Sequence, residues 1–354
     1  MKISNRLTVN VLFITAPIKC GLGFQFSTGF TGTAKTRSPC ISLFQRNMQT
    51  ISSKSCLQQS IQDEVLTGSL LTHRNLVVTF DLDNTLFPIN EVVESANVVM
   101  MQAMKEFVAG SSGKKDPCLQ SFLAHSKSIR QNLQNSGQEV SYCELRRLTI
   151  VQKLKECVQQ HHDVETVSHQ ILDKWIQERH RSAERYLFPQ TLEALQDLKS
   201  KNPSAIIGAI TNGRGCPLQM GNTLRPFFHF TVSGEDPDVF PDRKPSPRIF
   251  QVALDKARSL QQTKQPKSET TMKWVHLGDD YTNDVVAAAE LGAFSIWMMP
   301  KYLENSNKTE FWPSLSPEDL QKLQGQDEDH VQPHASAKIS CLSELCPTLA
   351  KFKA

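Results

Sequence analysis

The chain has 354 residues, of which 39% are hydrophobic and 21% are charged, a composition typical of a globular protein with one large core or two modest domains. No uninterrupted apolar run approaches the roughly 20 residues that span a bilayer. The net charge of +3 gives no support for nucleic acid or a membrane surface as a partner. The nine cysteines are odd in number and form no C-x-x-C pair, which predicts reduced or buried thiols and argues against a disulfide framework.

The first 62 residues contain no Asp or Glu, and Asp63 is the first acidic residue. The stretch is rich in Ser and Thr, and its basic residues are Lys2, Arg6, Lys19, Lys35, Arg37, Arg46 and Lys54. This composition predicts an organellar transit peptide over residues 1–65. Two readings compete: residues 7–18 as the apolar core of a secretory signal, and a disordered basic tail. Because hydroxyl residues are many and Arg is sparse, a plastid (chloroplast) leader is favoured over a mitochondrial one, and the fold is expected to begin near residue 70.

The first predicted strand ends in two acidic residues. Residues 77–80 are apolar or strand-forming and run directly into Asp81, with Asp83 two positions further on. Asn84 and Thr85 then indicate a turn. Such a run is typical of a buried parallel strand whose carboxyl end delivers the aspartates into a crevice. By itself the pattern also fits a buried strand capped by solvated acids.

About a hundred residues of helical pattern follow before the next strand. Apolar residues recur at three- and four-residue intervals and predict helices at residues 92–107, 121–133, 145–158 and 164–178. A crossover between parallel strands needs only about a dozen residues. The excess therefore predicts a helical domain inserted over residues 91–189.

Strands and helices alternate from residue 190 onward, which argues for a parallel sheet covered on both faces. The predicted strands are residues 204–210, 228–232, 274–277, 294–298 and one at Ile339, and the predicted helices are residues 191–200, 217–224, 249–257, 284–291 and 342–349. The expected fold class is α/β, with a Rossmann-like parallel sheet built from residues 72–90 and 190–354 and interrupted by the all-helical insertion. The polar residues 303–336 are expected to form a loop insert within this core.

Polar residues also follow two later parts of the predicted sheet. Thr211, Asn212 and Gly213 come after the second strand, where a hydroxyl and loop amides could hold an anion. A simple turn at the strand end is the alternative. Lys244 stands just before a helix and could neutralise a phosphate, although a lone Lys is usually a solvated surface residue.

The last such segment begins at Gly278 and contains Asp279, Asp280 and Asp284. These acids could merely cap the following helix, or they could supply hard oxygen ligands for Mg²⁺. Open α/β sheets place their sites at the carboxyl ends of their strands. The order of the four segments therefore predicts that they meet in one site.

The four segments resemble, in order, the four motifs of the haloacid dehalogenase-like (HAD) superfamily. They are DLDNT at residues 81–85, Thr211 after its apolar strand, Lys244 within KPSPRIF, and GDDYTND at residues 278–284. The resemblance covers about residues 75–300 and the last strand and helix, but neither the leader nor the loop insert. The helical insertion is similar to the C1-type cap of that superfamily, which closes over the site and selects the substrate.

The resemblance implies phosphoryl transfer. Asp81 would attack phosphorus to form an aspartyl-phosphate, and Asp83 would protonate the leaving oxygen and then deprotonate the hydrolytic water. Thr211, Asn212 and Lys244 would hold the phosphoryl oxygens. Family members that cleave carbon–halogen bonds lack an acid two positions after the nucleophile, so Asp83 favours a phosphatase or phosphomutase.

The implied cofactor is Mg²⁺, held by the Asp81 carboxylate, the Asp83 backbone carbonyl and Asp279. Asp280 or Asp284 would support the metal site or the lysine from behind these ligands. The expected partner is a small phosphorylated metabolite, such as a sugar phosphate, nucleoside monophosphate, flavin mononucleotide or phosphoglycolate. A phosphomutase and a catalytically idle regulatory protein are the alternatives, and the oligomeric state stays open.

Overall fold

The structure is a computed structural model, and it describes residues 75–111, 115–158, 163–264, 272–299 and 334–352, all of them within the compact unit Ser60–Ala354. The predicted leader and residues 303–333 of the predicted loop insert lie outside the described residues, so these two predictions stay predictions. Among the helices of the described ranges, none is both long enough and apolar enough to cross a membrane.

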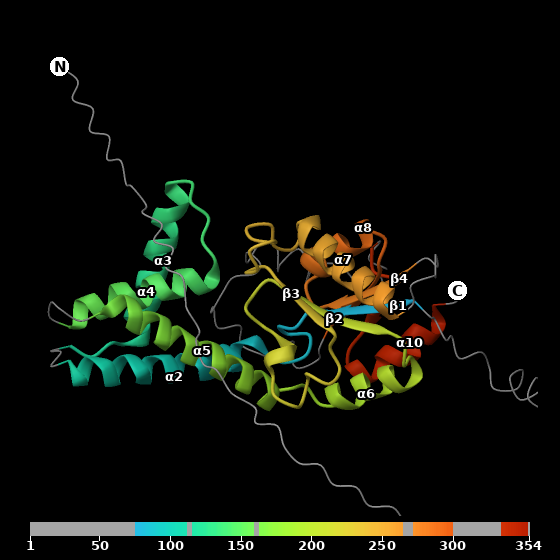
Figure 1. The fold of residues 1–354 in the computed structure, drawn as a ribbon, viewed down its shortest axis with the longest axis horizontal. Helices are drawn as coiled ribbons and strands as arrows, with labels where there is room; N and C mark the ends of the chain where they lie inside the picture. The colour runs from blue at the N-terminus through green and yellow to red at the C-terminus, as the bar shows by residue number, and fades with distance from the viewer. Residues whose placement is uncertain (1–74, 112–114, 159–162, 265–271, 300–333, 353–354) are drawn as a thin grey trace, which may run out of the picture. The chain divides into compact units, whose positions relative to one another are not determined.

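A six-stranded sheet in the order β3-β2-β1-β4-β5-β6 forms the centre of the fold (Figure 1). Its strands are β1 (Leu76–Phe80), β2 (Ile206–Thr211), β3 (Phe230–Ser233), β4 (Lys273–Gly278), β5 (Phe294–Met298) and β6 (Ala337–Ile339), and every neighbouring pair is parallel. The predicted α/β class is confirmed. β1 is buried along its whole length, as its apolar run requires, and the strand order reverses at this strand, the position where open α/β sheets place their sites.

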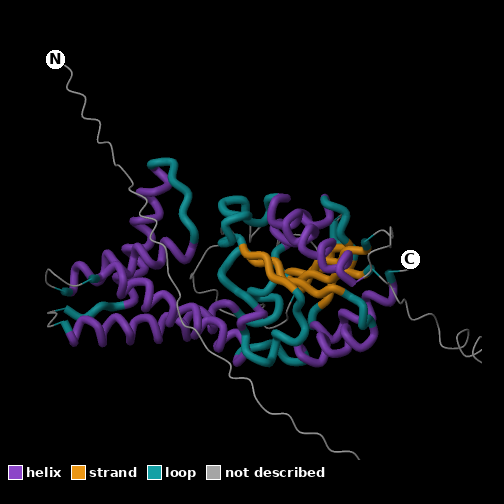
Figure 2. The backbone as a smooth tube through the Cα atoms, viewed as in Figure 1, coloured by secondary structure: helices purple, strands orange, loops and turns teal. Residues whose placement is uncertain are grey.

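Alternate residues of the strands face two separate hydrophobic cores. Val78 and Phe80 of β1 pack with helices α6 (Thr191–Lys201) and α10 (Leu345–Lys351) on one face of the sheet. Val77 packs on the other face with α7 (Pro247–Lys264) and α8 (Ala287–Glu290). Figure 2 shows helices on both sides of the strands, so the sheet is covered as its apolar strands predict.

Four helices lie between β1 and α6 in the chain and form a helical insert, residues 89–185. They are α2 (Ile89–Gly110), α3 (Leu119–Asn135), α4 (Tyr142–Cys157) and α5 (Val164–Arg185), and a core of their own, containing Met100, Met104, Ile150, Leu154 and Trp175, joins them. The first helix begins three residues earlier than predicted. Asn84 turns the chain with a φ of 61°, and its side-chain Oδ1 accepts the backbone N–H of Ile89 at 3.1 Å.

Two short helices differ from the prediction. The helix expected at residues 217–224 is only a 3₁₀ turn, η1 (Pro217–Gln219), because Met220 leaves the helical region with a ψ of 74° and Gly221 follows with a φ of +42°. The helix expected at residues 284–291 starts earlier, as a π-helical turn, η2 (Tyr281–Val286), which continues into α8. Its start is set by the Asp280 side chain, which accepts the N–H of Thr282 and of Asn283 at 3.0 and 2.8 Å.

Glu235, in the loop after β3, joins the helical insert to the sheet. Its carboxylate accepts the backbone N–H groups of Tyr142 at 2.7 Å and Cys143 at 2.9 Å, in the first turn of α4. Arg243 donates to the same carboxylate at 3.2 Å, and its guanidinium lies 3.8 Å from the centre of the Tyr142 ring. A buried carboxylate at a helix N-terminus satisfies donors that the helix itself leaves unpaired.

We expect Glu235→Ala to lower the free energy of unfolding by about 2 kcal/mol, because two backbone donors and a guanidinium lose a charged acceptor. Glu235→Gln should lose less, since its amide oxygen still accepts one N–H group. Chemical denaturation measures the change, with Glu139→Ala, an exposed loop residue, as the control. Equal stability of Glu235→Ala and Glu139→Ala would show that the contacts of Glu235 do not contribute to the free energy of unfolding.

Candidate active site

The predicted site residues meet at the carboxyl edge of the sheet. Asp81 directly follows β1, Thr211 is the last residue of β2, and Asp279 directly follows β4. β2 and β4 are the two neighbours of β1 in the sheet. The strand order therefore brings together residues that are far apart in the sequence, and η2 adds Asp284 to them.

Lys244 lies between two carboxylates. It is 6% exposed, and its Nζ donates to Oδ1 of Asp81 at 2.5 Å and to Oδ1 of Asp284 at 2.6 Å. The Asn212 side chain fixes the lysine backbone from both sides, accepting its N–H at 2.8 Å and donating to its C=O at 3.0 Å. Asn212 was predicted to hold phosphate, and that role stays a prediction; in the structure both polar atoms of its side chain bind the backbone of Lys244.

Thr211 and Thr85 shape the surroundings of Asp81. Thr85 donates from its hydroxyl to Oδ2 of Asp81 at 3.3 Å. Thr211 is buried, and its hydroxyl oxygen accepts the N–H of Gly213 at 3.2 Å, which bends the loop after β2 back toward the strand end. A threonine hydroxyl at the end of a strand next to β1, followed by a tight turn, is an arrangement that can contribute to an anion site.

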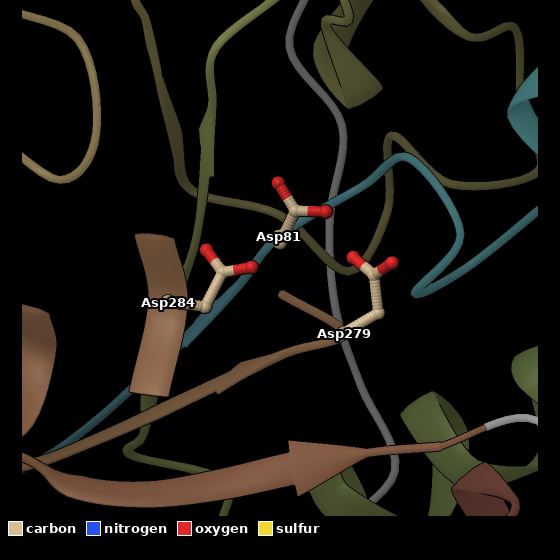
Figure 3. Close-up of side chains that lie close together, drawn as sticks. All are labelled: Asp81, Asp279 and Asp284. Carbon is tan, nitrogen blue, oxygen red and sulfur yellow. The ribbon is translucent and has the colours of Figure 1, made fainter. Parts of the chain in front are cut away.

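The carboxylates of Asp81, Asp279 and Asp284 form a cluster in which one oxygen of each lies within 4.8 Å of the others. Figure 3 shows the three side chains close together, with their carboxylate groups directed to the same side. Asp83 contributes no side-chain oxygen to this cluster, and its predicted role as a ligand through the backbone carbonyl stays a prediction. The sequence did not decide whether Asp280 or Asp284 would support the metal site. In the structure Asp284 belongs to the cluster, whereas the side chain of Asp280 caps η2.

The electrostatics of the cluster show an excess of negative charge. Burial raises the pKa of Asp81 to about 8, against the lowering effect of Lys244 and with a further rise from Asp284 and Asp83. Burial and the neighbouring carboxylates likewise raise the pKa of Asp279 well above its ordinary value. Burial would also raise the pKa of Asp284, but Lys244 and His276 outweigh it and lower that pKa.

These residues fit a divalent cation. Among the described residues the three clustered carboxylates are matched by one ammonium, that of Lys244, which pairs with Asp81 and Asp284, so a further positive charge between the carboxylates would be stabilised. Hard oxygen ligands of this kind are those that Mg²⁺ prefers. Asp81 and Asp279 would hold the ion, with Asp284 beside them and already bound to the lysine.

Gly278 allows the cluster to form. A Cβ atom on this residue would overlap the carboxylate of Asp284, so only glycine lets the acid of η2 approach the end of β4. The backbone N–H of Asp280 donates to Oδ2 of Asp284 at 3.2 Å. Both oxygens of Asp284 are therefore engaged before any ligand is bound.

A chain of buried polar groups, which the sequence reasoning missed, reaches Asp284 from the sheet. Trp274 donates its Nε1–H to the hydroxyl of Thr79 at 2.8 Å, that hydroxyl lies 2.9 Å from Nδ1 of His276, and Nε2 of His276 lies 3.3 Å from Oδ1 of Asp284. Burial lowers the pKa of His276. A neutral imidazole that donates from Nε2 to the carboxylate and accepts from Thr79 at Nδ1 satisfies every donor. The sequence did contain a signal for this chain of groups, because Thr79 and His276 are polar residues within otherwise apolar strands.

Arg179 is the second residue that sequence reasoning missed. It lies on α5 of the helical insert, and its Nη2 donates to both oxygens of Asp83, at 2.7 and 3.0 Å. Asp83 is half-buried and lies outside the carboxylate cluster. The helical insert therefore reaches the predicted acid/base residue directly.

The raised carboxyl pKa values predict how metal-free stability depends on pH. The pKa of Asp81 rises from 3.8 to about 8 on folding, so the folded state binds this proton more tightly. Its contribution to stability is present below about pH 4 and is lost as pH rises through about 8. Because a cation binds the deprotonated carboxylates, we expect Mg²⁺ to raise Tm more at about pH 8 than at about pH 5.

Thermal melts with and without Mg²⁺ at both pH values measure this difference. Asp279→Asn should remove most of the Mg²⁺-dependent rise, whereas Asp255→Asn, on the exposed face of α7, should leave it unchanged. A rise in Tm that is the same at both pH values and in Asp279→Asn would contradict a metal site at this cluster.

A family model described as haloacid dehalogenase-like hydrolase matches residues 76–292. Among solved structures, 2-haloacid dehalogenase from Pseudomonas syringae pv. Tomato DC3000 is 20% identical with a TM-score of 0.54, covering 79% of this chain and 100% of that one. The magnesium-bound HAD-hydrolase YfnB from Bacillus subtilis is 18% identical, with a TM-score of 0.42 and coverage of 78% of this chain and 99% of that one.

A HAD phosphatase from Thermococcus onnurineus is 14% identical with a TM-score of 0.40, covering 78% of this chain and 99% of that one. At these identities the likeness to solved structures shows the fold alone. A comparison with curated proteins found no match. The family model spans more than half of the residues and contains all four polar segments of the site. The chain therefore belongs to the haloacid dehalogenase-like hydrolase family.

Proposed function

We propose that this hydrolase is a Mg²⁺-dependent phosphatase that hydrolyses a small phosphomonoester through an aspartyl-phosphate on Asp81. One observation carries the proposal. Asp81 is a buried carboxylate held by Lys244 inside a cluster of acids, and a second carboxylate, Asp83, lies outside that cluster two residues further on. The two aspartates thus have different surroundings, which suits a nucleophile and a separate acid/base.

The geometry supports a role for each residue. Lys244 orients Asp81 through one carboxylate oxygen, and Thr85 contacts the other, so the nucleophile has a fixed direction. Lys244, the Thr211 hydroxyl and the backbone N–H groups after β2 would hold the phosphoryl oxygens. Asp83 would give a proton to the leaving alcohol and then take one from the attacking water. A bound Mg²⁺ would neutralise the clustered carboxylates and the phosphoryl charge.

Asp83 also separates this proposal from carbon–halogen cleavage. A halide leaves without needing a proton, whereas the alkoxide of a phosphomonoester is a poor leaving group and needs a general acid. The likeness to a haloacid dehalogenase, at 20% identity, concerns the fold and carries no reaction with it. A carboxylate at position 83, outside the cluster of Asp81, Asp279 and Asp284, supports phosphoryl transfer.

We expect the protein to release nitrophenol from p-nitrophenyl phosphate only with Mg²⁺, and EDTA to abolish the release. Asp81→Asn should lower kcat at least about a thousandfold, because the attacking carboxylate is lost, while the Tm stays near that of the wild type or rises. Asp255→Asn serves as the control. Metal-independent turnover, or an active Asp81→Asn, would overturn the proposal. Conversion of a sugar monophosphate into its isomer without phosphate release would favour a phosphomutase.

Asp83→Asn should separate the two chemical steps. Nitrophenolate leaves readily without a proton, so the first step should proceed, whereas hydrolysis of the aspartyl-phosphate loses its base. We expect a burst of nitrophenol close to one equivalent per protein, followed by slow turnover, in stopped-flow absorbance. Steady turnover at the wild-type rate without a burst would exclude Asp83 as the base.

A further inference from the structure

The helical insert brings two buried guanidinium groups to the side of the candidate active site. Arg179 on α5 is 2% exposed and Arg146 on α4 is 7% exposed. Nη2 of Arg179 contacts Asp83, but its Nη1 is buried and has no hydrogen-bond partner among the described residues. Nε of Arg146 is buried and without a partner in the same part of the chain, and its guanidinium lies 3.6 Å from the centre of the Trp175 ring.

These two cations lack matching negative charge. Within the described residues, Asp83 is the one carboxylate in an ion pair with Arg179, and none is paired with Arg146. Burial and the positive charge of Arg179 lower the pKa of Arg146 to about 10, despite opposing effects of Cys143 and Glu235. A buried guanidinium without a counter-charge is strongly destabilising unless an anion binds to it. This side of the site is therefore suited to an anionic ligand.

The position of Arg179 indicates which part of a substrate it would meet. Under the proposed function, Asp83 reaches the ester oxygen of the substrate, and Nη2 of Arg179 lies 2.7 Å from Asp83. The loop after β2 packs closely against the guanidinium, because a Cβ atom at Gly215 would lie 3.0 Å from its Nη1 and one at Gly213 would lie 3.7 Å from its Nη2. Two glycines thus let the loop after the second strand approach Arg179 beside Asp83. A group attached next to the ester oxygen would come within reach of Arg179.

We infer that Arg179, with the charge of Arg146 behind it, binds a second anionic group of the substrate, a carboxylate or a second phosphate carried one or two carbons from the ester oxygen. This inference rests on the proposed function and narrows its substrate class. A planar guanidinium with free N–H donors matches the paired oxygens of either group, which a lysine would not do equally well.

Matched substrates test the inference by turnover. Phosphoglycolate carries a carboxylate, 2-hydroxyethyl phosphate is its neutral counterpart of similar size, and a short-chain diol bisphosphate carries the second phosphate. We expect kcat/KM of the wild type to favour one or both anionic substrates by about 10- to 100-fold, the effect of a hydrogen bond to a charged group. Arg179→Met should bring that ratio near one by raising KM, Arg179→Lys should keep part of it, and Arg181→Met, exposed on the same helix, should keep all of it.

A binding measurement judges the inference without turnover. In Asp81→Asn with Mg²⁺, which lacks the nucleophile, phosphoglycolate or the bisphosphate should raise Tm more than 2-hydroxyethyl phosphate does, and Arg179→Met should remove the difference. Equal shifts with all three ligands, or differences that survive in Arg179→Met, would overturn the inference. Absence of phosphate release from every ester by the wild type would instead refute the phosphatase proposal, whatever the binding result.

Discussion

The ion pairs of Lys244 with Asp81 and Asp284 are the interactions on which the arrangement of the site depends. A buried ammonium between two carboxylates allows acids from β1 and η2 to lie close together, which their mutual repulsion would otherwise oppose. The lysine is itself held by Asn212 at the end of β2, and Asp284 by the chain of groups that begins at Trp274. Three strands thus position one cation, and through it the proposed nucleophile.

One lysine does not neutralise the whole cluster. Burial raises the pKa values of Asp81 and Asp279, and the neighbouring carboxylates raise them further, so ionising these groups together is costly unless a cation such as Mg²⁺ binds. The site is therefore less stable when its carboxylates are ionised without a cation, and metal binding and the charge state of the proposed nucleophile depend on one another. Such a balance is common at functional sites, where part of the stability of the fold is given up to hold reactive groups together.

The helical insert reaches the sheet through two polar contacts of different character. Glu235 accepts the backbone N–H groups of α4, a contact that fixes where that helix begins. Arg179 reaches the predicted acid/base residue, a contact that ties the insert to the chemistry. Both contacts depend on buried charged groups. If the insert moved away from the sheet, water would solvate these groups, and the free-energy cost would be modest. Replacing one partner of a contact while the insert stays in place would instead leave a buried charge unpaired.

Much of this protein is determined by its sequence. The apolar run before Asp81, the alternation of strands and helices after residue 190 and the polar residues at successive strand ends predicted the parallel sheet and most of its site residues, because burial on both faces requires continuous apolar strands and places polar groups at their ends. Local backbone chemistry set the boundaries: Asn84 with its positive φ starts α2 early, and the non-helical Met220 and Gly221 keep the expected helix at residues 217–224 to a single turn.

The contacts of Arg179, His276 and Asn212 were decided only by the tertiary structure. Arg179 occupies the buried side of α5, four residues after Trp175, where periodicity alone predicts an apolar residue. Its partner Asp83 is 96 residues away in the chain, and His276 meets Thr79 across two strands 197 residues apart. The sequence could therefore indicate that polar residues gather at the edge of the sheet, but which charge faces which depends on strand order and on the path of the helical insert, and no local pattern encodes either.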